Sequence, residues 1–298
     1  MCGIVGLLIK TPELRHELGR MMLPMLLGMT ERGPDSAGMA VYRDPVAPGR
    51  RKFSLYGADR SSRWPEVAAA ARQALSGEEE FSACANHAIL TSTVPVTDVA
   101  SWLRNAFPDV HLLSVGRSID LYKDVGSPAD IASRYEFADF SGTHVVGHTR
   151  MATESAVTPA HAHPFTAGED FCLVHNGSLS NPGSVRRRLE LDGVEFDTDN
   201  DTEGACRYLY QRMCAGESLE TALRHAFDDL DGFYTFLIGT KDELAIVRDA
   251  FSCKPAIVAE TDDYVAVSSE YRSLAKLPGI RHAKLFEPMP EEIYVWRA

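Results

Sequence analysis

The segment FYTFLIGT (residues 233–240), followed closely by ELAIVRD (residues 243–249), decides the fold class of this chain. Both segments are apolar runs of strand length, and a short turn separates them. Three further strand candidates follow at 255–260, 264–269 and 292–296. Consecutive strands joined by short turns are typical of antiparallel sheets, because parallel strands need a long crossover between them. The C-terminal third of the chain therefore predicts an antiparallel sheet.

The remainder of the chain supplies further strands and a small number of helices. Candidate strands lie at 3–9, 38–43, 119–123, 144–149 and 170–175. Candidate helices lie at 13–29, where Pro24 should kink or shorten the helix, from about Asp201 onward, and at 218–229. Two successive helices suggest a layer that covers a sheet. These elements predict an α+β fold.

Residues from about 44 to 118 differ in character from the segments on either side. They contain a Pro/Gly/Arg loop at 45–51, helices at 64–75 and 97–106, and strands at 85–92 and 110–115. This order predicts a small α/β insert with its own partial core. We expect residues 1–298 to form a single domain that carries this insert, which is either a structural addition or a docking surface.

Composition limits the classes of protein to which the chain can belong. It has 298 residues, of which 45% are apolar and 24% are charged, and its net charge is -12. This acidity argues against binding to nucleic acid or to an anionic membrane. The apolar stretch at the N-terminus ends at Lys10, too early for a signal peptide or a membrane span, so a cytoplasmic location is expected. The six cysteines are scattered without metal-ligand spacing and are expected to be thiols.

Cys2 is the residue with the clearest chemical potential. Removal of the initiator methionine would place a thiol and a free α-amino group on one residue. The amino group titrates near pH ~8 and could take the proton of the adjacent thiol, so that nucleophile and base would coincide. The alternative is an ordinary buried cysteine at the start of the strand at 3–9, and position 2 alone leaves that alternative open.

Four polar clusters elsewhere in the chain bear on this choice: RGPDSAG (32–38), GHTRMAT (147–153), HNGSLSN (175–181) and DNDTE (199–203). The first is, by itself, a plausible surface loop. In the second, Arg150 follows an apolar strand and indicates either a structural ion pair or a clamp for a carboxylate.

The third and fourth clusters each have a structural and a functional interpretation. Asn176-Gly177 is a strong hairpin signal, but an Asn amide and the next backbone N–H can also converge on an oxyanion. The fourth cluster lies at a helix start, where an Asp or Asn is a normal N-cap and Glu203 suits the first turn, but a second carboxylate such as Asp201 could equally bind a substrate ammonium. Together with Cys2 and Arg150, these groups are what an enzyme needs to cleave the side-chain amide of a free α-amino acid.

The motifs resemble those of class II glutamine amidotransferases, members of the N-terminal-nucleophile hydrolase superfamily. The resemblance includes CGIVG (2–6), the four clusters above, and the later pieces LDGFY (230–234), RD (248–249), KP (254–255) and SSE (268–270). It covers most of the chain apart from the insert. The resemblance implies a four-layer αββα sandwich of two antiparallel sheets and a glutaminase activity.

The resemblance also implies a role for each site residue. Cys2 would be the nucleophile and its own α-amino group the base. Asn176 and Gly177 would form the oxyanion hole. Arg150 would bind the α-carboxylate of glutamine, and Asp201 its α-ammonium group.

Other residues carry supporting roles by the same resemblance. Thr153 would contribute to the glutamine pocket, and Arg32 would order the loop beside the nucleophile. His161 and His163 would support their loop rather than act as bases, since a base is already present. The chain departs from the family pattern at Met151 and at Glu154-Ser155, which flank the pocket.

The destination of the ammonia is expected to be another polypeptide. The sequence contains no phosphoribosyl-pyrophosphate loop, no pyrophosphatase loop and no Walker A motif. The chain most resembles the stand-alone amidotransferase subunit of N-methylglutamate synthase, and next that of an archaeal-type split glutamate synthase. No cofactor is expected in this chain, and flavin and iron–sulfur groups would belong to the partner synthase. The competing hypotheses are a non-catalytic glutamine-binding or scaffold subunit and a different N-terminal-nucleophile amidase.

Overall fold

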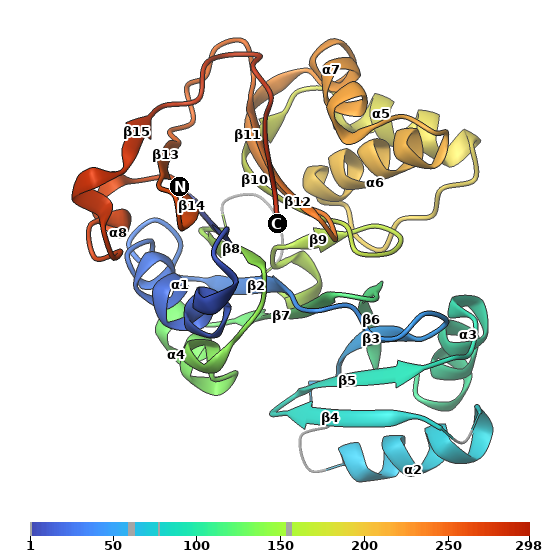
Figure 1. Ribbon diagram of the computed structural model, residues 1–298. Helices are drawn as coiled ribbons and strands as arrows, with labels where there is room; N and C mark the ends of the chain where they lie inside the picture. Colours follow the sequence, from blue (N-terminus) through green and yellow to red (C-terminus); the bar gives the residue numbers. More distant parts are fainter. Residues whose placement is uncertain (1, 59–62, 77, 153–156) are drawn as a thin grey trace.

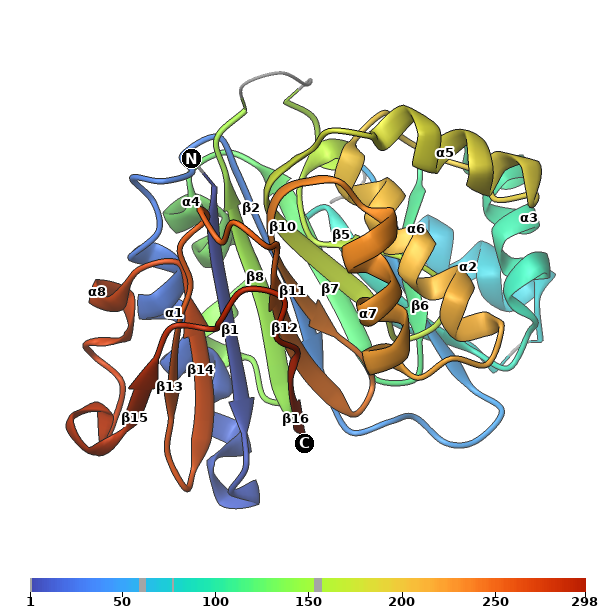
Figure 2. The ribbon, with the colours of Figure 1, turned by 90° about the horizontal axis from the view of Figure 1, so that it is seen from above.

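The computed structural model describes residues 2–58, 63–76, 78–152 and 157–298. In these residues the strands form three antiparallel sheets, of seven, five and four strands. The first sheet has the order β15-β13-β14-β1-β8-β2-β7, and the second the order β16-β12-β11-β10-β9. Figures 1 and 2 show these two sheets facing each other. The prediction of an α+β fold built on antiparallel sheets is confirmed.

Each of the two main sheets combines strands from distant parts of the chain. The first sheet contains β1 Gly3–Ile9, β2 Ser36–Tyr42, β7 Ile119–Val125, β8 His144–Arg150, β13 Ile257–Glu260, β14 Tyr264–Ser268 and β15 Lys284–Phe286. The second contains β9 Phe165–Thr166, β10 Cys172–Leu179, β11 Gly232–Gly239, β12 Glu243–Arg248 and β16 Tyr294–Arg297. The helices outside the insert are α1 Leu18–Leu27, α4 Pro128–Arg134, α5 Pro182–Leu191, α6 Asp201–Cys214, α7 Leu219–Asp229 and α8 Tyr271–Leu274. Short 3₁₀ helices lie at η1 Pro12–Glu17, η2 Phe137–Asp139, η3 Pro159–His161 and η4 Ile280–His282.

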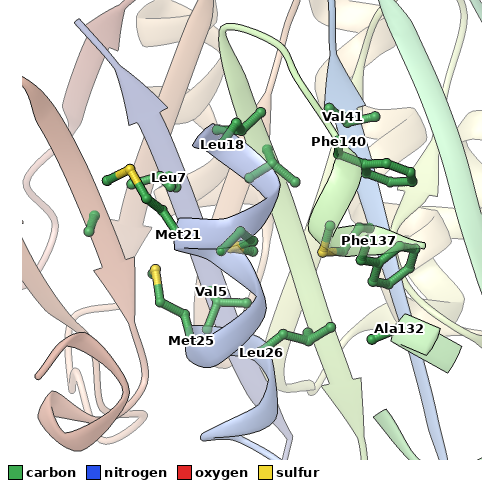
Figure 3. Close-up of a cluster of buried hydrophobic side chains, with 14 of the residues drawn as sticks. Val5, Leu7, Leu18, Met21, Met25, Leu26, Val41, Ala132, Phe137 and Phe140 are labelled. Carbon is green, nitrogen blue, oxygen red and sulfur yellow. The ribbon is translucent and has the colours of Figure 1, made fainter. Parts of the chain in front are cut away.

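Strand β1 shows how the layers are held together. Because side chains alternate along a strand, β1 presents apolar groups to both faces of the first sheet. Val5 and Leu7 pack on one face against α1 (Figure 3). Ile4 and Leu8 point the other way, into a core shared with the second sheet. The outer face of the second sheet is covered by α5, α6 and α7, so the layers run helix, sheet, sheet, helix (Figure 2).

The first helix differs from its prediction at 13–29. Residues 12–17 form the 3₁₀ helix η1, which has no buried residue, and the α-helix occupies Leu18–Leu27. Pro24 lies inside α1, as expected, and lacks the N–H that would bond to the turn before it. The buried side chains Leu18, Met22 and Leu26 hold the helix on the sheet. The apolar repeat thus placed the helix correctly, while its predicted first turn was wrong.

The Asn176-Gly177 hairpin interpretation is wrong. Strand β10 runs straight through both residues, and they pair with Thr235 and Tyr234 of β11. Seven strands and α-helices were not predicted: β3, β4, β9, β15, α4, α5 and α8. Polar or charged residues interrupt β3, β4 and α5, and helix α5 begins with Pro182-Gly183, a pair that is more often found in turns.

Residues 51–116 form a separate unit beside the two main sheets (Figure 1). Its sheet consists of β3 Arg51–Tyr56, β4 Glu80–Cys84, β5 His87–Ser92 and β6 His111–Gly116, and its helices are α2 Trp64–Ala74 and α3 Val96–Ala106. A core of its own, which includes Phe53, Trp64 and Leu103, lies between the sheet and these helices.

The unit leaves and re-enters the first sheet at adjacent strands. Tyr42, the last residue of β2, pairs with Ile119, the first residue of β7. The return is fixed by Asp170, whose carboxylate accepts hydrogen bonds from the backbone N–H groups of residues 117, 118 and 119 at 2.8, 2.8 and 2.9 Å. The insert therefore occupies the place of a hairpin turn between β2 and β7.

Candidate active site

Antiparallel pairing brings Cys2 to Arg150. Gly3 of β1 lies opposite Thr149 of β8, so the next residues, Cys2 and Arg150, also face each other. Cys2 is half-buried and its Sγ lies 4.0 Å from the carbonyl oxygen of Met151. Arg150 is only 4% exposed, which is unusual for a guanidinium at the end of a strand. The pairing of β1 with β8 thus joins two predicted site residues that are 148 positions apart in the chain.

The surroundings of Cys2 disfavour its thiolate form. Burial raises the pKa of Cys2, and the positive charges of Arg150 and Arg32 oppose that effect only in part. Because the thiolate is the nucleophilic form, this thiol needs a base to remove its proton at neutral pH.

Arg32 holds the backbone of the candidate nucleophile. Its Nε donates to the carbonyl oxygen of Cys2 at 2.9 Å, and a terminal nitrogen pairs with Glu270 at 3.0 Å. Arg272 pairs with the same glutamate at 2.6 Å. Arg32 contacts the main chain of Cys2, so it orients this residue without bonding to the thiol. Glu270 was quoted only as part of a family motif, and its contact with Arg32 could not be read from the sequence.

The RGPDSAG loop packs closely on the end of β8. A Cβ on Gly33 would lie 2.3 to 2.5 Å from backbone atoms of Thr149 and Arg150, so only glycine fits there. Asp35 then fixes the backbone that follows Arg150 with two hydrogen bonds. Its N–H donates to the Arg150 carbonyl at 3.0 Å, and its carboxylate accepts from the Ala152 N–H at 2.8 Å.

Strand β10 of the second sheet crosses the same end of β8. His148 of β8 bonds through Nε2 to the carbonyl oxygen of His175 at 3.0 Å. The next residue, Asn176, is 3% exposed, and its amide nitrogen has no acceptor among the described residues. Gly177 has φ +145, and a Cβ there would lie 1.8 Å from the Phe233 carbonyl oxygen. A buried amide donor normally has an acceptor, which makes Asn176 a candidate binding group.

Asp201 lies in the first turn of α6, beside the end of β10. The N-cap predicted for this cluster is Asn200, whose side chain accepts from the Thr202 N–H at 2.9 Å, so Asp201 is not the cap. Asp201 instead accepts from the Leu179 N–H at 2.9 Å, and His175 Nδ1 lies 3.7 Å from its other oxygen. Burial tends to raise the pKa of Asp201, but hydrogen bonds from His175 and the backbone lower it overall. The result is an anionic carboxylate that is partly open to solvent.

The loop histidines have different surroundings. His161 pairs with the exposed Asp199 at 2.9 Å and with Thr158 at 2.7 Å. His163 is buried and contacts the Thr202 hydroxyl at 2.9 Å. Sequence reasoning gave no role to Thr202, His148 or His175, although all three lie inside the quoted motifs.

Some predicted features lie outside the residues that the structure describes. These are Thr153, the departures at Glu154-Ser155, and Met1. Met151 is described, and its carbonyl faces the Cys2 thiol. In the described part of the chain, no group of three or more His, Cys, Asp or Glu residues could hold a metal ion, and no helix is long and apolar enough to cross a membrane.

The chain is similar in sequence to known glutamine amidotransferases. A family model described as a glutamine amidotransferase domain matches residues 148–276. The chain is 45% identical to the glutamine amidotransferase-like protein GlxB of Rhizobium meliloti, over 99% of this chain and 98% of that protein.

Two solved structures share the fold. One, described as the allosteric regulatory enzyme of purine biosynthesis, is 18% identical with a TM-score of 0.64. The other, glutamine phosphoribosylpyrophosphate amidotransferase from B. subtilis, is 17% identical with a TM-score of 0.61. Each match covers 99% of this chain but only 47% and 49% of the solved chains, so this chain spans about half their length. At such low identity the likeness establishes the fold alone.

Proposed function

Because this chain belongs to the class II glutamine amidotransferase family, we propose that it hydrolyses L-glutamine to glutamate and ammonia. The observation that carries the proposal is the buried amide of Asn176, whose nitrogen has no partner among the described residues. It lies on the strand that crosses the end of β8, where Cys2 and Arg150 meet. The helix–sheet–sheet–helix order would then be the four-layer sandwich of the N-terminal-nucleophile hydrolases.

Cys2 is the proposed nucleophile. Once Met1 is removed, the α-amino group of Cys2 would act as its base, since it titrates near pH ~8. The raised pKa of the thiol is consistent with this need for a base. The hydrogen bond from Arg32 to the Cys2 carbonyl would fix the direction of the thiol.

The oxyanion hole is assigned to Asn176 Nδ2 and the N–H of Gly177. An amide donor that has no partner before the reaction can meet the developing negative charge without first breaking another hydrogen bond. The backbone conformation of Gly177, at φ +145, is one that residues with a Cβ rarely adopt. Loss of one such donor typically costs about 3 kcal/mol of transition-state stabilisation.

Substrate recognition is assigned to Arg150 and Asp201. Arg150 would bind the α-carboxylate of glutamine through two parallel N–H groups, and the anionic Asp201 would bind the α-ammonium. Thr153 would complete the pocket. This pair of charges selects a free amino acid over a peptide or an acylated amine, which lacks one or both of the groups.

The reaction then proceeds in two halves. The Cys2 thiolate attacks the carboxamide carbon, and the oxyanion hole stabilises the tetrahedral intermediate. The protonated α-amino group gives its proton to the departing nitrogen, so ammonia leaves and a thioester remains. The amino group then takes a proton from water, which attacks the thioester and releases glutamate.

We assign the ammonia to a separate synthase subunit. N-methylglutamate synthase is the first candidate and a split glutamate synthase the second, on the strength of resemblance and of the missing synthase motifs in this sequence. Flavin and iron–sulfur groups would then belong to that partner. Co-purification of this chain with such a subunit, and a rise in glutamate release when the two are mixed, would support the assignment. Full glutaminase activity of the isolated chain would count against it.

The test of the glutaminase proposal is covalent labelling of the nucleophile. Protein lacking Met1 is incubated with a glutamine-mimicking alkylator and its intact mass is measured. We expect one adduct, located at Cys2, which disappears in Cys2→Ser and persists in Cys253→Ser, a matched control at an exposed cysteine. Excess glutamine should slow the labelling. If processed wild-type protein gains no adduct at Cys2, the chain is the non-catalytic subunit instead.

A further inference from the structure

A single hydroxyl group joins three segments of the chain behind Asp201. Thr202 Oγ1 lies 2.9 Å from His163 Nε2, 3.1 Å from His175 Nδ1 and 3.4 Å from Asp201 Oδ1. His163 precedes β9, His175 lies on β10, and Thr202 and Asp201 begin α6. Thr202 and both histidines are at most 5% exposed, so this group of side chains lies in the interior of the protein.

The chemistry of a hydroxyl restricts how these bonds can be arranged. A threonine hydroxyl donates one hydrogen and accepts up to two. His175 Nδ1 also lies 3.7 Å from the Asp201 carboxylate, where an N–H is attracted and a bare lone pair is repelled. If both histidines donate to Thr202, its single hydrogen remains for Asp201, the strongest acceptor of the group. We call Thr202, His163, His175 and Asp201 the hub. In this arrangement every N–H and O–H group that faces Thr202 has an acceptor.

The outward-facing ring nitrogens agree with the same arrangement. His163 Nδ1 and His175 Nε2 are buried and have no partner among the described residues. A buried N–H without an acceptor is rare, so these positions suit bare nitrogens, with the hydrogens on the sides that face Thr202. Burial lowers the pKa of His163 well below its ordinary value, so that ring holds a single N–H.

The far side of the hub is anchored to the first sheet. Lys123 of β7 donates from Nζ to the carbonyl oxygens of Ala162 and Pro164, at 2.8 and 3.3 Å. These two hydrogen bonds fix the backbone before and after His163. The His163 ring also stacks on that of His148, with centroids 4.1 Å apart. These contacts join the His163 side of the hub to the first sheet.

We propose that Thr202 is a positioning residue for substrate recognition. Its hydroxyl accepts N–H donors from His163 and His175 and donates to Asp201, which fixes the carboxylate toward the α-ammonium of the substrate. The proposal rests on the glutaminase function proposed above. It deepens that function by naming the group that orients the ammonium-binding carboxylate.

The test compares glutamine with glutaramate, which is glutamine without its α-amino group. Thr202→Val keeps the shape of the side chain and removes the hydroxyl, so the carboxylate loses its fixed direction. We expect kcat/KM for glutamine to fall about tenfold, mainly through KM, because the loss of one charge-assisted hydrogen bond typically weakens binding by about that factor. We expect kcat/KM for glutaramate to change less than twofold, because glutaramate has no α-ammonium for Asp201 to bind. Thr202→Ser, which keeps the hydroxyl, should retain the wild-type preference for glutamine over glutaramate. Thr221→Val, whose hydroxyl pairs with Ser218 in the first turn of α7, is the matched control and should leave the ratio unchanged.

A second measurement does not depend on activity. Nitrogen-15 NMR of histidine-labelled wild-type protein distinguishes the two neutral forms of each ring. We expect the hydrogen on Nδ1 of His175 and on Nε2 of His163, with assignment by His175→Gln. A hydrogen on Nε2 of His175 would overturn the proposal, because the Thr202 hydrogen would then point to His175.

The outcomes separate this proposal from the one it rests on. An active wild type whose preference for glutamine survives in Thr202→Val overturns the role of Thr202 and leaves the glutaminase standing. An inactive, unlabelled wild type overturns the glutaminase, whatever the NMR shows.

Discussion

Arg150 is the residue whose replacement tests substrate recognition most directly. It is buried at the end of β8, where a guanidinium can offer two parallel N–H groups to a carboxylate. We expect Arg150→Ala to lower kcat/KM for glutamine about 100-fold, mainly through KM, since hydrogen bonds to a charged group contribute roughly 1.5–3 kcal/mol each. Steady-state glutamate release measures the change. Arg20→Ala, at an exposed arginine of α1, should behave as wild type. A KM within twofold of wild type in Arg150→Ala would remove Arg150 from the site.

The N-terminal residue sets a condition on activity. If the base is the α-amino group of Cys2, protein that keeps Met1 or carries an N-terminal tag should lack glutaminase activity, because an amide nitrogen cannot accept the thiol proton. The comparison uses one preparation with a cleavable N-terminal tag, assayed before and after cleavage to a free Cys2. A C-terminally tagged protein is the control. Equal activity before and after cleavage would show that another group is the base.

At the scale of elements, strand β10 depends on Gly177. A Cβ at this position would lie 1.8 Å from the Phe233 carbonyl oxygen, and the backbone has φ +145. We expect Gly177→Ala to lower the free energy of unfolding by at least about 3 kcal/mol, because strain and loss of strand pairing add. Gly183→Ala in α5 is the matched control: nothing lies within 4 Å of its added Cβ, so it should be neutral or slightly stabilising. Urea unfolding measures the free energy of unfolding of both variants. Equal free energies for Gly177→Ala and Gly183→Ala would contradict the geometry at Gly177.

The sequence predicted apolar elements well and polar ones poorly. Strands such as β1 and helices such as α7 could be predicted because their apolar periodicity is also what buries them. Strand β4 was missed because its residues are mostly exposed or half-buried, so no pattern marks them. For the site, the residue types and their order predicted Cys2 and Arg150 as a pair. The contacts of Thr202 could not be predicted, because they depend on how β10 and α6 meet in space.

At the scale of the whole molecule, buried histidines make stability depend on pH. Burial lowers the pKa of His87 and His148 to about 3 and that of His144 to about 4. In the unfolded chain these rings titrate near pH ~6.5, so between the two values the unfolded chain binds more protons. Stability therefore rises with pH across this window and is lost as the pH falls below about 6.5.

We expect the free energy of unfolding to fall between pH 7.5 and 5, by up to about 1.4 kcal/mol per pH unit for each such histidine. Urea titrations at several pH values measure the slope. His144→Gln should reduce it by about one proton, whereas His16→Gln, at an exposed histidine, should leave it unchanged. A free energy of unfolding that is the same at pH 7.5 and pH 5 would contradict the burial of these rings.

The position of the insert also affects the order in which the chain folds. Tyr42 and Ile119 are paired neighbours in the first sheet, yet residues 43–118 lie between them. A flexible connection of that length costs about 3 kcal/mol more to close than a two-residue turn. Residues 51–116 have their own core, and once it has formed, the two ends of the connection are already close together. We therefore expect the insert to fold before or together with the pairing of β2 and β7, so that the β7 edge is a late step in completing the first sheet.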